Sequence, residues 1–504
     1  MINIYNFGHN REKKFGLKKG RLGVNIFLIV AIVICVLAVS TLFVYLVNMG
    51  ILPFKYVIIC LAASLIVAIV SVLMLWLSKK HRITTTLYGI FLIIVSAAIC
   101  FGLVYLIQTR NFFSQTKARE FYVINYSIYV HQDSEFQELQ DLNDKRLATY
   151  IDTVTSYTEA FDELKQQINF STTLNNTYLD AVSSFKNHEA DFIMLSDSYV
   201  DILNDLEENF SETIRKIYTI DIKVFESVEV RDVDVLHEPF NIYISGIDVK
   251  GDISTVSRSD VNMIVTINPN THKILLTSIP RDFYMQLHGT TGLKDKLTHS
   301  GIYGPTMTVK TVEDFLNIDI NYFVRVNFSS VMNLVDAIGG VYLTPNITLY
   351  RNTDGVGCYY QKDVKELFYG ACALRYARER KAYGTGDIQR IQNQQQVLTA
   401  ILDKLMSPEI IKNYSSILAA VQSNFETSLP EQKIYQLINN QLDSMPKWEV
   451  LDCHMEGFDS HSDIYSYGKN EAGDYGVNYY YVMEPNYDTV EAAKAKIKAV
   501  FAGE

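Results

Sequence analysis

Arginine and aspartate recur together beside short apolar segments in the middle of the sequence. The guanidinium group is planar, always charged, and binds phosphate oxygens in pairs, and two carboxylates can hold Mg²⁺ together with substrate phosphates. One such cluster is more often a surface ion pair that contributes little. Recurrence of the same two residue types within one region instead favours a diphosphate site with a metal ion. The five clusters are Asp248; Arg258 with Asp260; Arg281 with Asp282; Arg378 with Arg380; and Asp387 with Arg390 and Gln394.

The spacing within the clusters predicts which side chains share a face. Arg258 and Asp260 are two residues apart, so in an extended chain they point to the same side. In the helix predicted to open at Asp387, Arg390 and Gln394 follow at i+3 and i+7. The opposite stripe is predicted to face the core and comprises Ile388, Ile391, Leu398, Leu402 and Leu405.

Histidine chemistry is not indicated by the sequence. A Ser-His-Asp set does not stand out, and His272, His288 and His299 are scattered and interpreted as surface residues. Neither a C-x-x-C motif nor a histidine-rich cluster is present, which argues against a zinc site.

Alternating strand and helix patterns surround the five clusters. Apolar runs at 241–245, 261–267 and 273–279 predict strands, with a turn at 268–271 that makes the second and third a hairpin. Helical patterns follow at 308–316 and 329–338, the latter ended by Gly339-Gly340. A further strand near 448–453 and helices near 408–422, 430–442 and 489–501 complete an α/β domain over residues 238–504, with the clusters within 240–405.

A separate α/β unit is predicted at residues 118–225. Its start at 121–130 is rich in β-forming residues, helical periods follow at 157–168 and 178–185, and a short apolar run lies at 191–195. The pattern is typical of half of a small ligand-binding α/β fold, and it contains no residues that suggest chemistry. We call it the accessory unit.

Three N-terminal segments are long and apolar enough to cross a bilayer, which takes about 20 residues. They lie at 24–47, 52–77 and 83–107 within a predicted membrane region 23–108, and Lys55, near an end, is their one charged residue. Six basic residues precede the first segment, and Lys79, Lys80 and Arg82 lie between the second and third. The positive-inside rule therefore places residues 1–22 in the cytoplasm and residues after 108 outside. A cleaved signal peptide does not fit three successive spans.

Charge is distributed as unevenly as hydrophobicity. The whole chain has a net charge of −11; residues 1–108 hold ten Lys/Arg and one acid, Glu12, so the remainder carries −20 by difference. An acidic region lacks the basic footprint that nucleic-acid binding needs, so no nucleic-acid partner is expected. Of the six cysteines, Cys358 and Cys372 are spaced for a disulfide in an oxidising compartment, and a free pair fits the sequence equally well.

Residues 238–405 resemble the catalytic domain of the LytR–CpsA–Psr family, and the three spans with the accessory unit resemble its capsule-associated CpsA branch. Order and spacing agree throughout. The runs that carry the resemblance are Gly246-Ile-Asp248, Ser257-Arg-Ser-Asp260, Ser278-Ile-Pro-Arg-Asp282, Val335-Asp-Ala-Ile-Gly-Gly-Val341, Tyr376-Ala-Arg-Glu-Arg380 and Gly386-Asp-Ile-Gln-Arg-Ile-Gln-Asn-Gln394. The run at 335–341 is interpreted as structural: Asp336 caps or pairs locally, and the two glycines make a turn.

The resemblance implies an α/β sandwich with a central mixed sheet. It implies a transferase that moves a glycan, of capsule or teichoic-acid type, from polyprenyl pyrophosphate to peptidoglycan at the outer face of a bacterial, Gram-positive plasma membrane. Mg²⁺ is the expected cofactor, with Mn²⁺ as an alternative, and capsule assembly proteins are expected partners. Carried over by position, the metal ligands are Asp248 and Asp260, and the pyrophosphate ligands are Arg258, Arg281, Arg378, Arg380, Arg390 and Gln394. The predicted catalytic residues are Arg281, Asp282 and Asp387, and the sequence does not decide between Asp282 and Asp387 as the general base.

This chain departs from the family pattern at position 393. Members often have arginine where this chain has Asn393, so one basic contact to the donor is expected to be missing.

The alternatives to the transferase are a nonenzymatic scaffold or regulator of capsule assembly that binds lipid pyrophosphate, a lipid pyrophosphatase with water as acceptor, and a transcriptional attenuator. The predicted topology opposes the last, because the large acidic region lies outside the membrane.

Overall fold

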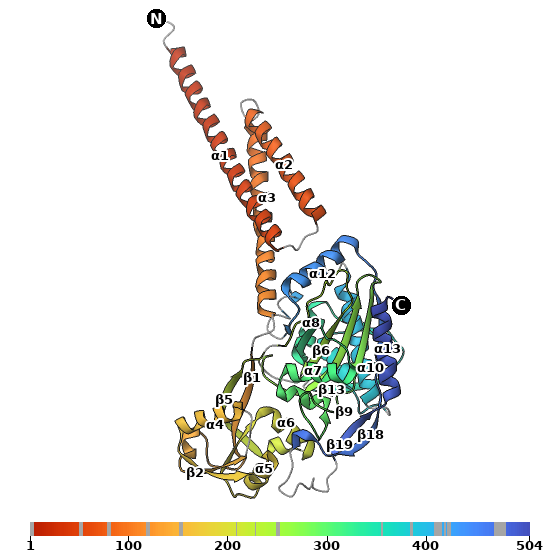
Figure 1. Ribbon diagram of the computed structural model, residues 1–504. Coiled ribbons are helices and arrows are strands. Elements are labelled where there is room, and N and C mark those ends of the chain that lie inside the picture. Colours follow the sequence, from red (N-terminus) through yellow and green to blue (C-terminus); the bar gives the residue numbers. More distant parts are fainter. Residues whose placement is uncertain are drawn as a thin grey trace. The chain divides into compact units, whose positions relative to one another are not determined.

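The computed structural model describes the backbone from Tyr5 to Glu504 apart from residues 50–53, 78–81, 117–120, 151–154, 208, 227, 248–252, 354–355, 384–386, 408–415, 418–419, 421–424 and 468–479. The chain forms two compact units. The helical unit comprises Met1–Ser114 with Glu431–Pro446, and the sheet unit comprises Gln115–Pro430 with Lys447–Glu504. Figure 1 shows the chain from the red N-terminus to the blue C-terminus.

The helical unit contains three long apolar helices, α1 (Tyr5–Met49), α2 (Phe54–Leu77) and α3 (Arg82–Thr116). Their most apolar stretches have mean hydropathies of 3.1, 3.0 and 2.9 and are long enough to span a membrane. Leu28 and Cys35 of α1 pack with Leu92 of α3 and with Val67 of α2. The three predicted spans are therefore helices that pack together. The helix α12 (Glu431–Ser444) belongs to the same unit, and its buried Tyr435 packs against Tyr45 and Leu106.

The accessory unit is built on a five-stranded mixed sheet in the order β3-β2-β4-β1-β5. The strands are β1 (Tyr122–His131), β2 (Lys145–Tyr150), β3 (Phe170–Asn175), β4 (Phe192–Ser196) and β5 (Ile214–Val224). Helices α4 (Thr155–Gln167), α5 (Tyr178–Lys186) and α6 (Asp197–Leu206) connect them. The sequence patterns predicted most of these elements, but β3, α6 and β5 were missed.

The central sheet has six strands in the order β16-β11-β6-β7-β8-β17. β11 runs parallel to β6 and β17 parallel to β8, whereas the other neighbours are antiparallel, so the sheet is mixed as predicted. The bounds are β6 (Phe240–Ile247), β7 (Ser259–Asn268), β8 (Lys273–Ile279), β11 (Tyr322–Asn327), β16 (Phe425–Thr427) and β17 (Glu449–His454).

Helices cover both faces of the central sheet. Side chains alternate along the strands, so each face presents its own set of apolar residues to the helices that cover it. On one face Tyr243, Ile264 and Leu275 pack with helices α7 (Pro305–Leu316) and α13 (Tyr487–Ala502). On the other face Met263, Val265 and Leu276 pack with Leu398 and Leu402 of α10 (Asp387–Leu405). This is the predicted α/β sandwich, and these two leucines confirm the predicted core stripe of α10. The side chain of Ile388 lies outside the described residues.

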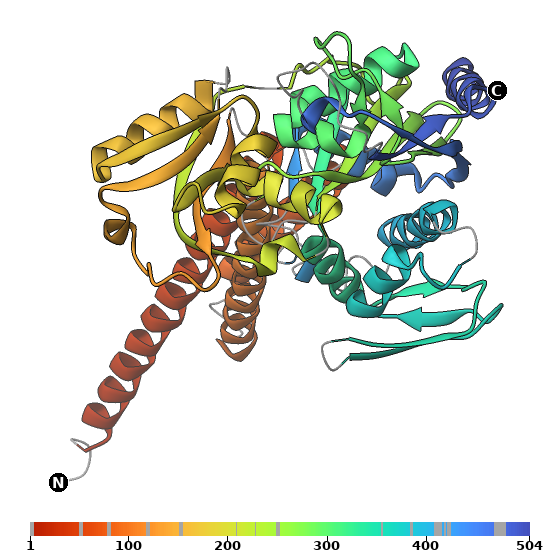
Figure 2. The ribbon, with the colours of Figure 1, turned by 90° about the horizontal axis from the view of Figure 1, so that it is seen from below.

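A small subdomain follows β11. It contains α8 (Phe328–Ala337), two hairpins and α9 (Gly370–Arg378), and Figure 2 shows its teal strands as a layer beside the cyan helix α10. The hairpins pair β12 (Val341–Leu343) with β15 (Glu366–Phe368) and β13 (Leu349–Thr353) with β14 (Val356–Tyr360). Their inward residues share a core with α8, α9 and α10. A disulfide joins Cys358 to Cys372, which settles the open alternative.

Short elements complete the sheet unit beside β8. These are β9 (Tyr284–Met285), β10 (Asp295–Lys296), the 3₁₀ helix η3 (Leu297–Tyr303), and the hairpin of β18 (Gly457–Ser462) with β19 (Tyr480–Pro485). The helix predicted near 408–422 lies mostly outside the described residues, and the predicted domain boundaries remain predictions.

Candidate functional site

Four strands of the central sheet, β6, β7, β8 and β11, begin or end at one edge of the sheet. The registers place Asn327 opposite Ile247, Ile247 opposite Ser259, and Asn262 opposite Ile279. The carboxyl ends of β6, β8 and β11 therefore meet the start of β7. The sequence clusters at 258–260 and 281–282 adjoin this edge, whereas Asp248 lies outside the described residues.

A β-bulge positions Asp260 at this edge. Gly246 pairs with Val261 while Ile247 pairs with Ser259, so Asp260 is the additional residue of the bulge. Bulges bend a strand and re-aim a side chain, and they are common beside active sites. Gly246 permits the close approach, because a Cβ atom there would lie 2.8 Å from Cβ of Val261.

Arg281 joins the buried Asp282 to Asp260, whose side chain is 11% exposed. Its Nη1 donates to Oδ1 of Asp260 at 2.9 Å, and its Nε donates to Oδ2 of Asp282 at 3.4 Å. Burial, the largest single effect, raises the pKa of each carboxyl, but Arg281 together with the other nearby cations and hydrogen-bond donors brings both pKa values below the ordinary 3.8. Both aspartates are therefore ionised at neutral pH, and the guanidinium lies between them as a shared cation.

Two further sequence-predicted arginines are tied to this group. Arg258 is close enough to Asp260 to help lower its pKa, and Arg390, buried on α10, acts in the same way on Asp282. The structure thus brings Arg258, Asp260, Arg281, Asp282 and Arg390 together from β7, β8 and α10. These elements are far apart in the chain, which is why the sequence could predict the residue types but not the assembly.

The remaining predicted residues lie on α9 and α10 or beyond α9. Arg378, the last residue of α9, is exposed and stacks its guanidinium over Phe328 with 4.5 Å to the ring centre. Phe328 directly follows β11, so Arg378 lies at the same sheet edge. Arg380 is exposed two residues beyond α9, and Gln394 is half-buried one turn after Arg390. Asp387 begins α10, and its side chain lies outside the described residues.

The η3 segment contributes residues that the sequence analysis missed. Thr298 donates from Oγ1 to Oδ1 of Asp260 at 3.1 Å, and Nζ of Lys296 lies 3.8 Å from Oδ1 of Asp282. Gly301 lets η3 lie against the backbone before β7, because a Cβ atom there would be 2.8 Å from N of Ser259. The contacts of these residues to Asp260 and Asp282 depend on the tertiary fold, so no local sequence pattern indicated them.

The prediction that His299 lies at the surface was wrong. Its side chain has no exposed area, and its Nδ1 lies 2.7 Å from Oδ1 of the equally buried Asp295, one helical turn earlier. Ser466 contacts the same pair through its hydroxyl and its backbone N–H. A buried histidine is kept by such hydrogen bonds, and only the i, i+4 spacing of Asp295 and His299 could have suggested the pair.

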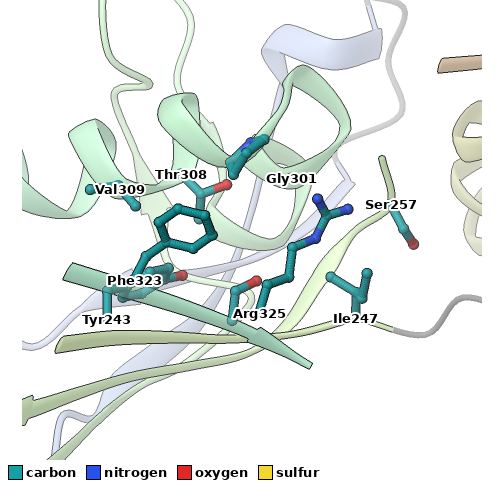
Figure 3. A pocket seen from close by; sticks show the side chains of 10 residues that line it. Tyr243, Ile247, Ser257, Gly301, Thr308, Val309, Phe323 and Arg325 are labelled. Atoms are coloured by element: carbon teal, nitrogen blue, oxygen red, sulfur yellow. The ribbon is translucent and has the colours of Figure 1, made fainter. Parts of the chain in front are cut away.

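A narrow cavity lies between the central sheet and η3 with α7 (Figure 3). Tyr243, Ile247, Val309 and Phe323 give it a largely apolar wall, and Arg325 enters from β11. Its volume of about 10 Å³ is close to what one water molecule needs. Ser257 also lines it and directly precedes Arg258, so the cavity begins beside the charged group.

The described acids fit a hard divalent cation only in part. Mg²⁺ is commonly held by one or two carboxylates together with phosphate oxygens and water. Both hydrogen bonds reported above for Asp260 end on Oδ1, so Oδ2 suits such a ligand. Among the described residues no group of three or more His, Cys, Asp or Glu side chains could hold a metal. A site here would therefore use Asp260, Asp248 and the substrate.

The profile of the LytR_cpsA_psr family matches residues 209–494, more than half of the chain. This chain belongs to that family. A relative from Bacillus cereus strain AH820, the polyisoprenyl-teichoic acid–peptidoglycan teichoic acid transferase TagU, is 34% identical over 231 residues, covering 46% of this chain and 74% of the relative. The protein of the same name from Enterococcus faecalis strain V583 is 36% identical over 196 residues, covering 38% and 62%.

Solved structures include relatives of the LytR_cpsA_psr domain. Bacillus subtilis TagV is 29% identical with a TM-score of 0.42 and covers 53% of this chain and 98% of its own. TagT bound to LI-WTA is 26% identical with a TM-score of 0.40 and covers 54% and 95%.

Two features noted in the sequence, Asn393 and the run 335–341, hold elements of this chain together. Asn393, which stands where members often have arginine, is fully buried, donates from Nδ2 to the carbonyl of Tyr376 at 3.0 Å and accepts from Gln389. It therefore ties α10 to α9. Asp336 accepts from the N–H of Gly370 at 2.7 Å, and Gly339 and Gly340 take φ values of 81° and 84° in the turn after α8.

Proposed function

We propose that this protein transfers a glycan from a polyprenyl-pyrophosphate carrier to peptidoglycan by Mg²⁺-assisted phosphoryl transfer. The observation that carries the proposal is Arg281 shared between two ionised, largely covered aspartates at the sheet edge, with Arg258 and Arg390 beside them. Membership of a family whose relatives are named teichoic acid transferases supports the same reaction.

The residues divide between binding and chemistry. Arg258, Arg281, Arg378, Arg380 and Arg390, with Gln394, would bind the pyrophosphate, whereas Asp248 and Asp260 would hold the metal. Bound Mg²⁺ would neutralise charge on the phosphate oxygens. The acceptor hydroxyl attacks the phosphorus attached to the sugar; a new P–O bond forms to the acceptor, the bond to the bridging oxygen breaks, and polyprenyl phosphate leaves. Preorganised arginines supply the largest stabilisation in such a reaction.

The proton of the acceptor hydroxyl needs a base, for which Asp282 and Asp387 are the candidates. The pKa of Asp282 is raised by burial but brought below its ordinary value by Arg281, Lys296 and Arg390. A carboxylate stabilised in this way is a weak base. We therefore assign Asp282 to orienting Arg281 and assign Asp387 to accepting the proton.

The carrier lipid would enter the cavity between sheet and helices. The cavity begins beside Arg258, and Val309 and Phe323 give it apolar walls. At about 10 Å³ it does not hold an isoprenoid chain, so the lipid would have to move α7 and η3 away from the sheet. Apolar burial of the chain would offset the cost of that movement.

The cellular setting proposed for the reaction is the outer face of a Gram-positive plasma membrane. The three apolar helices support a membrane anchor with the N-terminus in the cytoplasm and the sheet unit outside. The polymer would be a capsule or teichoic-acid-type glycan, and capsule assembly proteins are the proposed partners.

The experiment that tests the proposal follows release of polyprenyl phosphate from a polyprenyl-pyrophosphate glycan by the full chain in detergent with Mg²⁺. Release should require peptidoglycan and stop with EDTA or Arg281→Ala. Arg146→Ala is the matched control, because Arg146 forms a partly exposed pair with Asp191 on the accessory unit. Release without peptidoglycan would indicate a pyrophosphatase, and donor binding without release would indicate a scaffold; either result would overturn the proposed transfer.

A further inference from the structure

One face of α6 connects the accessory unit to the segment that carries Arg258. Ser198, Ile202 and Asp205 follow at i, i+4 and i+7 and so share a stripe of the helix. Ile202 has no exposed area and packs in a cluster with Tyr284, Ile302 and other residues of the catalytic domain. The accessory unit is therefore anchored on the catalytic domain through this stripe.

The backbone that leads to Arg258 is held by the accessory unit. Val123 of β1 donates to the carbonyl of Ser254 at 2.9 Å and accepts from the N–H of Val256 at 2.9 Å. Ser198 of α6 donates from its hydroxyl to the carbonyl of Val256 at 3.0 Å. Residues 254–256 thus extend the accessory sheet as a short parallel bridge, two residues before the arginine.

The side chain of Arg258 is fixed from the same helix. Its Nη1 donates to Oδ2 of Asp205 in an ion pair, in which the arginine side chain is 18% exposed and the aspartate 45%. Burial lowers the pKa of Arg258, but Asp260, Asp205 and Asp201 together raise it above its ordinary value. Arg258 therefore faces carboxylates from two domains, Asp260 on the sheet and the acids of α6.

Asp205 leaves the arginine able to bind a second anion. A guanidinium carries five N–H donors in a fixed fork, and the pair with Asp205 is made through Nη1. Asp260 attracts the same cation and already accepts from Arg281. The pair with Asp205 on α6 fixes one end of the guanidinium fork, so the position of Arg258 does not depend on Asp260 alone.

We propose that α6 of the accessory unit positions Arg258 through Asp205, so that the pyrophosphate site is built jointly by the accessory unit and the catalytic sheet. The inference rests on the proposed function, because it takes Arg258 as a ligand of the donor pyrophosphate. Asp205 is a positioning residue that acts through the arginine and does not touch the substrate.

The test measures the affinity of the full chain in detergent for farnesyl pyrophosphate with Mg²⁺. Asp205→Ala should weaken binding about three- to tenfold, as expected for coupled neighbours, and Asp205→Glu should restore much of the loss. In an Arg258→Ala background Asp205→Ala should have no further effect. Glu207→Ala is the matched control, because it removes an exposed pair with Lys186 at the end of the same helix.

Several outcomes would overturn the positioning role. These are unchanged binding by Asp205→Ala, tighter binding, which would make Asp205 a competitor of the phosphate, and a loss that adds to that of Arg258→Ala. If Asp205→Ala lowers the melting temperature, the isosteric Asp205→Asn replaces it with the same expected direction. Arg281→Ala is the separating arm: binding that survives this change contradicts the proposed function itself, whatever Asp205 does.

Discussion

At the scale of single residues, charge compensation at the sheet edge explains why the site is stable without exposed acids. Asp282 is buried, Asp260 has a side chain that is 11% exposed, and Arg281 serves both. Removing one member of a buried pair costs about 3–5 kcal/mol, because it leaves an uncompensated charge. Arg281 is thus both a structural cation and the proposed phosphate ligand, and its variants need a stability control.

The lowered pKa values of the two aspartates predict how stability depends on pH. Burial raises the pKa of each group most, yet Arg281 and the neighbouring cations and hydrogen-bond donors together bring both pKa values below the ordinary 3.8. The stabilisation is therefore fully present above the unfolded pKa and is lost as pH falls through the lower folded values. Thermal unfolding of the full chain between pH 3 and 7 should show a melting temperature that falls below about pH 4. Asp260→Asn should lessen this fall, and an equally steep fall in that variant would contradict the assignment.

The residue types of the site could be predicted from the sequence better than the burial and contacts of each side chain. Arg258, Arg281 and Arg390 were predicted from their pairing with aspartates, and the structure brings them to one edge. Lys296 and Thr298 were missed because their contacts to Asp282 and Asp260 are made only in the folded chain. His299 was wrongly predicted to lie at the surface, because the hydrophobicity of its neighbours in the sequence does not indicate burial.

At the scale of elements, the distance between α7 and the sheet sets the size of the cavity beside Arg258. Val309 of α7 lines that cavity and is buried. Val309→Phe should fill the space and weaken binding of farnesyl pyrophosphate severalfold, while overpacking costs about 1–3 kcal/mol of stability. Inorganic pyrophosphate, which has no chain, should bind the variant as it binds the natural protein. Equal binding of farnesyl pyrophosphate to both proteins would place the lipid elsewhere.

The disulfide stabilises the hairpin subdomain between α8 and α10. Cys358 of β14 and Cys372 of α9 are 14 residues apart in sequence. Closing a loop of that length is worth about 3 kcal/mol in the chain-entropy account. Cys358→Ser with Cys372→Ser should lower the melting temperature and speed hydrogen exchange over residues 341–378. Unchanged exchange there would show that the core of this subdomain suffices without the bond.

One strand of the central sheet, β11, was missed because the partner that explains its composition is distant in the sequence. β11 is only six residues long and contains Arg325, which reads as a surface strand. Arg325 is in fact buried, with Nη1 3.6 Å from Oε2 of Glu426 on the neighbouring edge strand. That partner lies about a hundred residues later, so no local pattern could reveal it. The long periodic helices, by contrast, were predicted because their apolar stripes are local.

At the scale of the whole molecule, hydropathy and charge divide the chain into a basic membrane part and an acidic remainder. The three helices are long and apolar enough to span a bilayer. With native cysteines replaced, Gln132→Cys should react with a membrane-impermeant maleimide on intact cells. Asn10→Cys should react only after permeabilisation. The reverse pattern would invert the proposed topology and remove access to an external acceptor.

The most direct test of the central claim is covalent transfer by the full chain in lipid nanodiscs. The assay combines a polyprenyl-pyrophosphate glycan, peptidoglycan and Mg²⁺, and it measures glycan that remains bound to peptidoglycan after detergent and denaturant washes. We expect linkage by the natural protein and by Arg146→Ala, and its loss with EDTA or with a folded Arg281→Ala variant. Linkage that persists in Arg281→Ala would contradict the proposed site, and absence of linkage by a natural protein that binds the donor would contradict the proposed transferase.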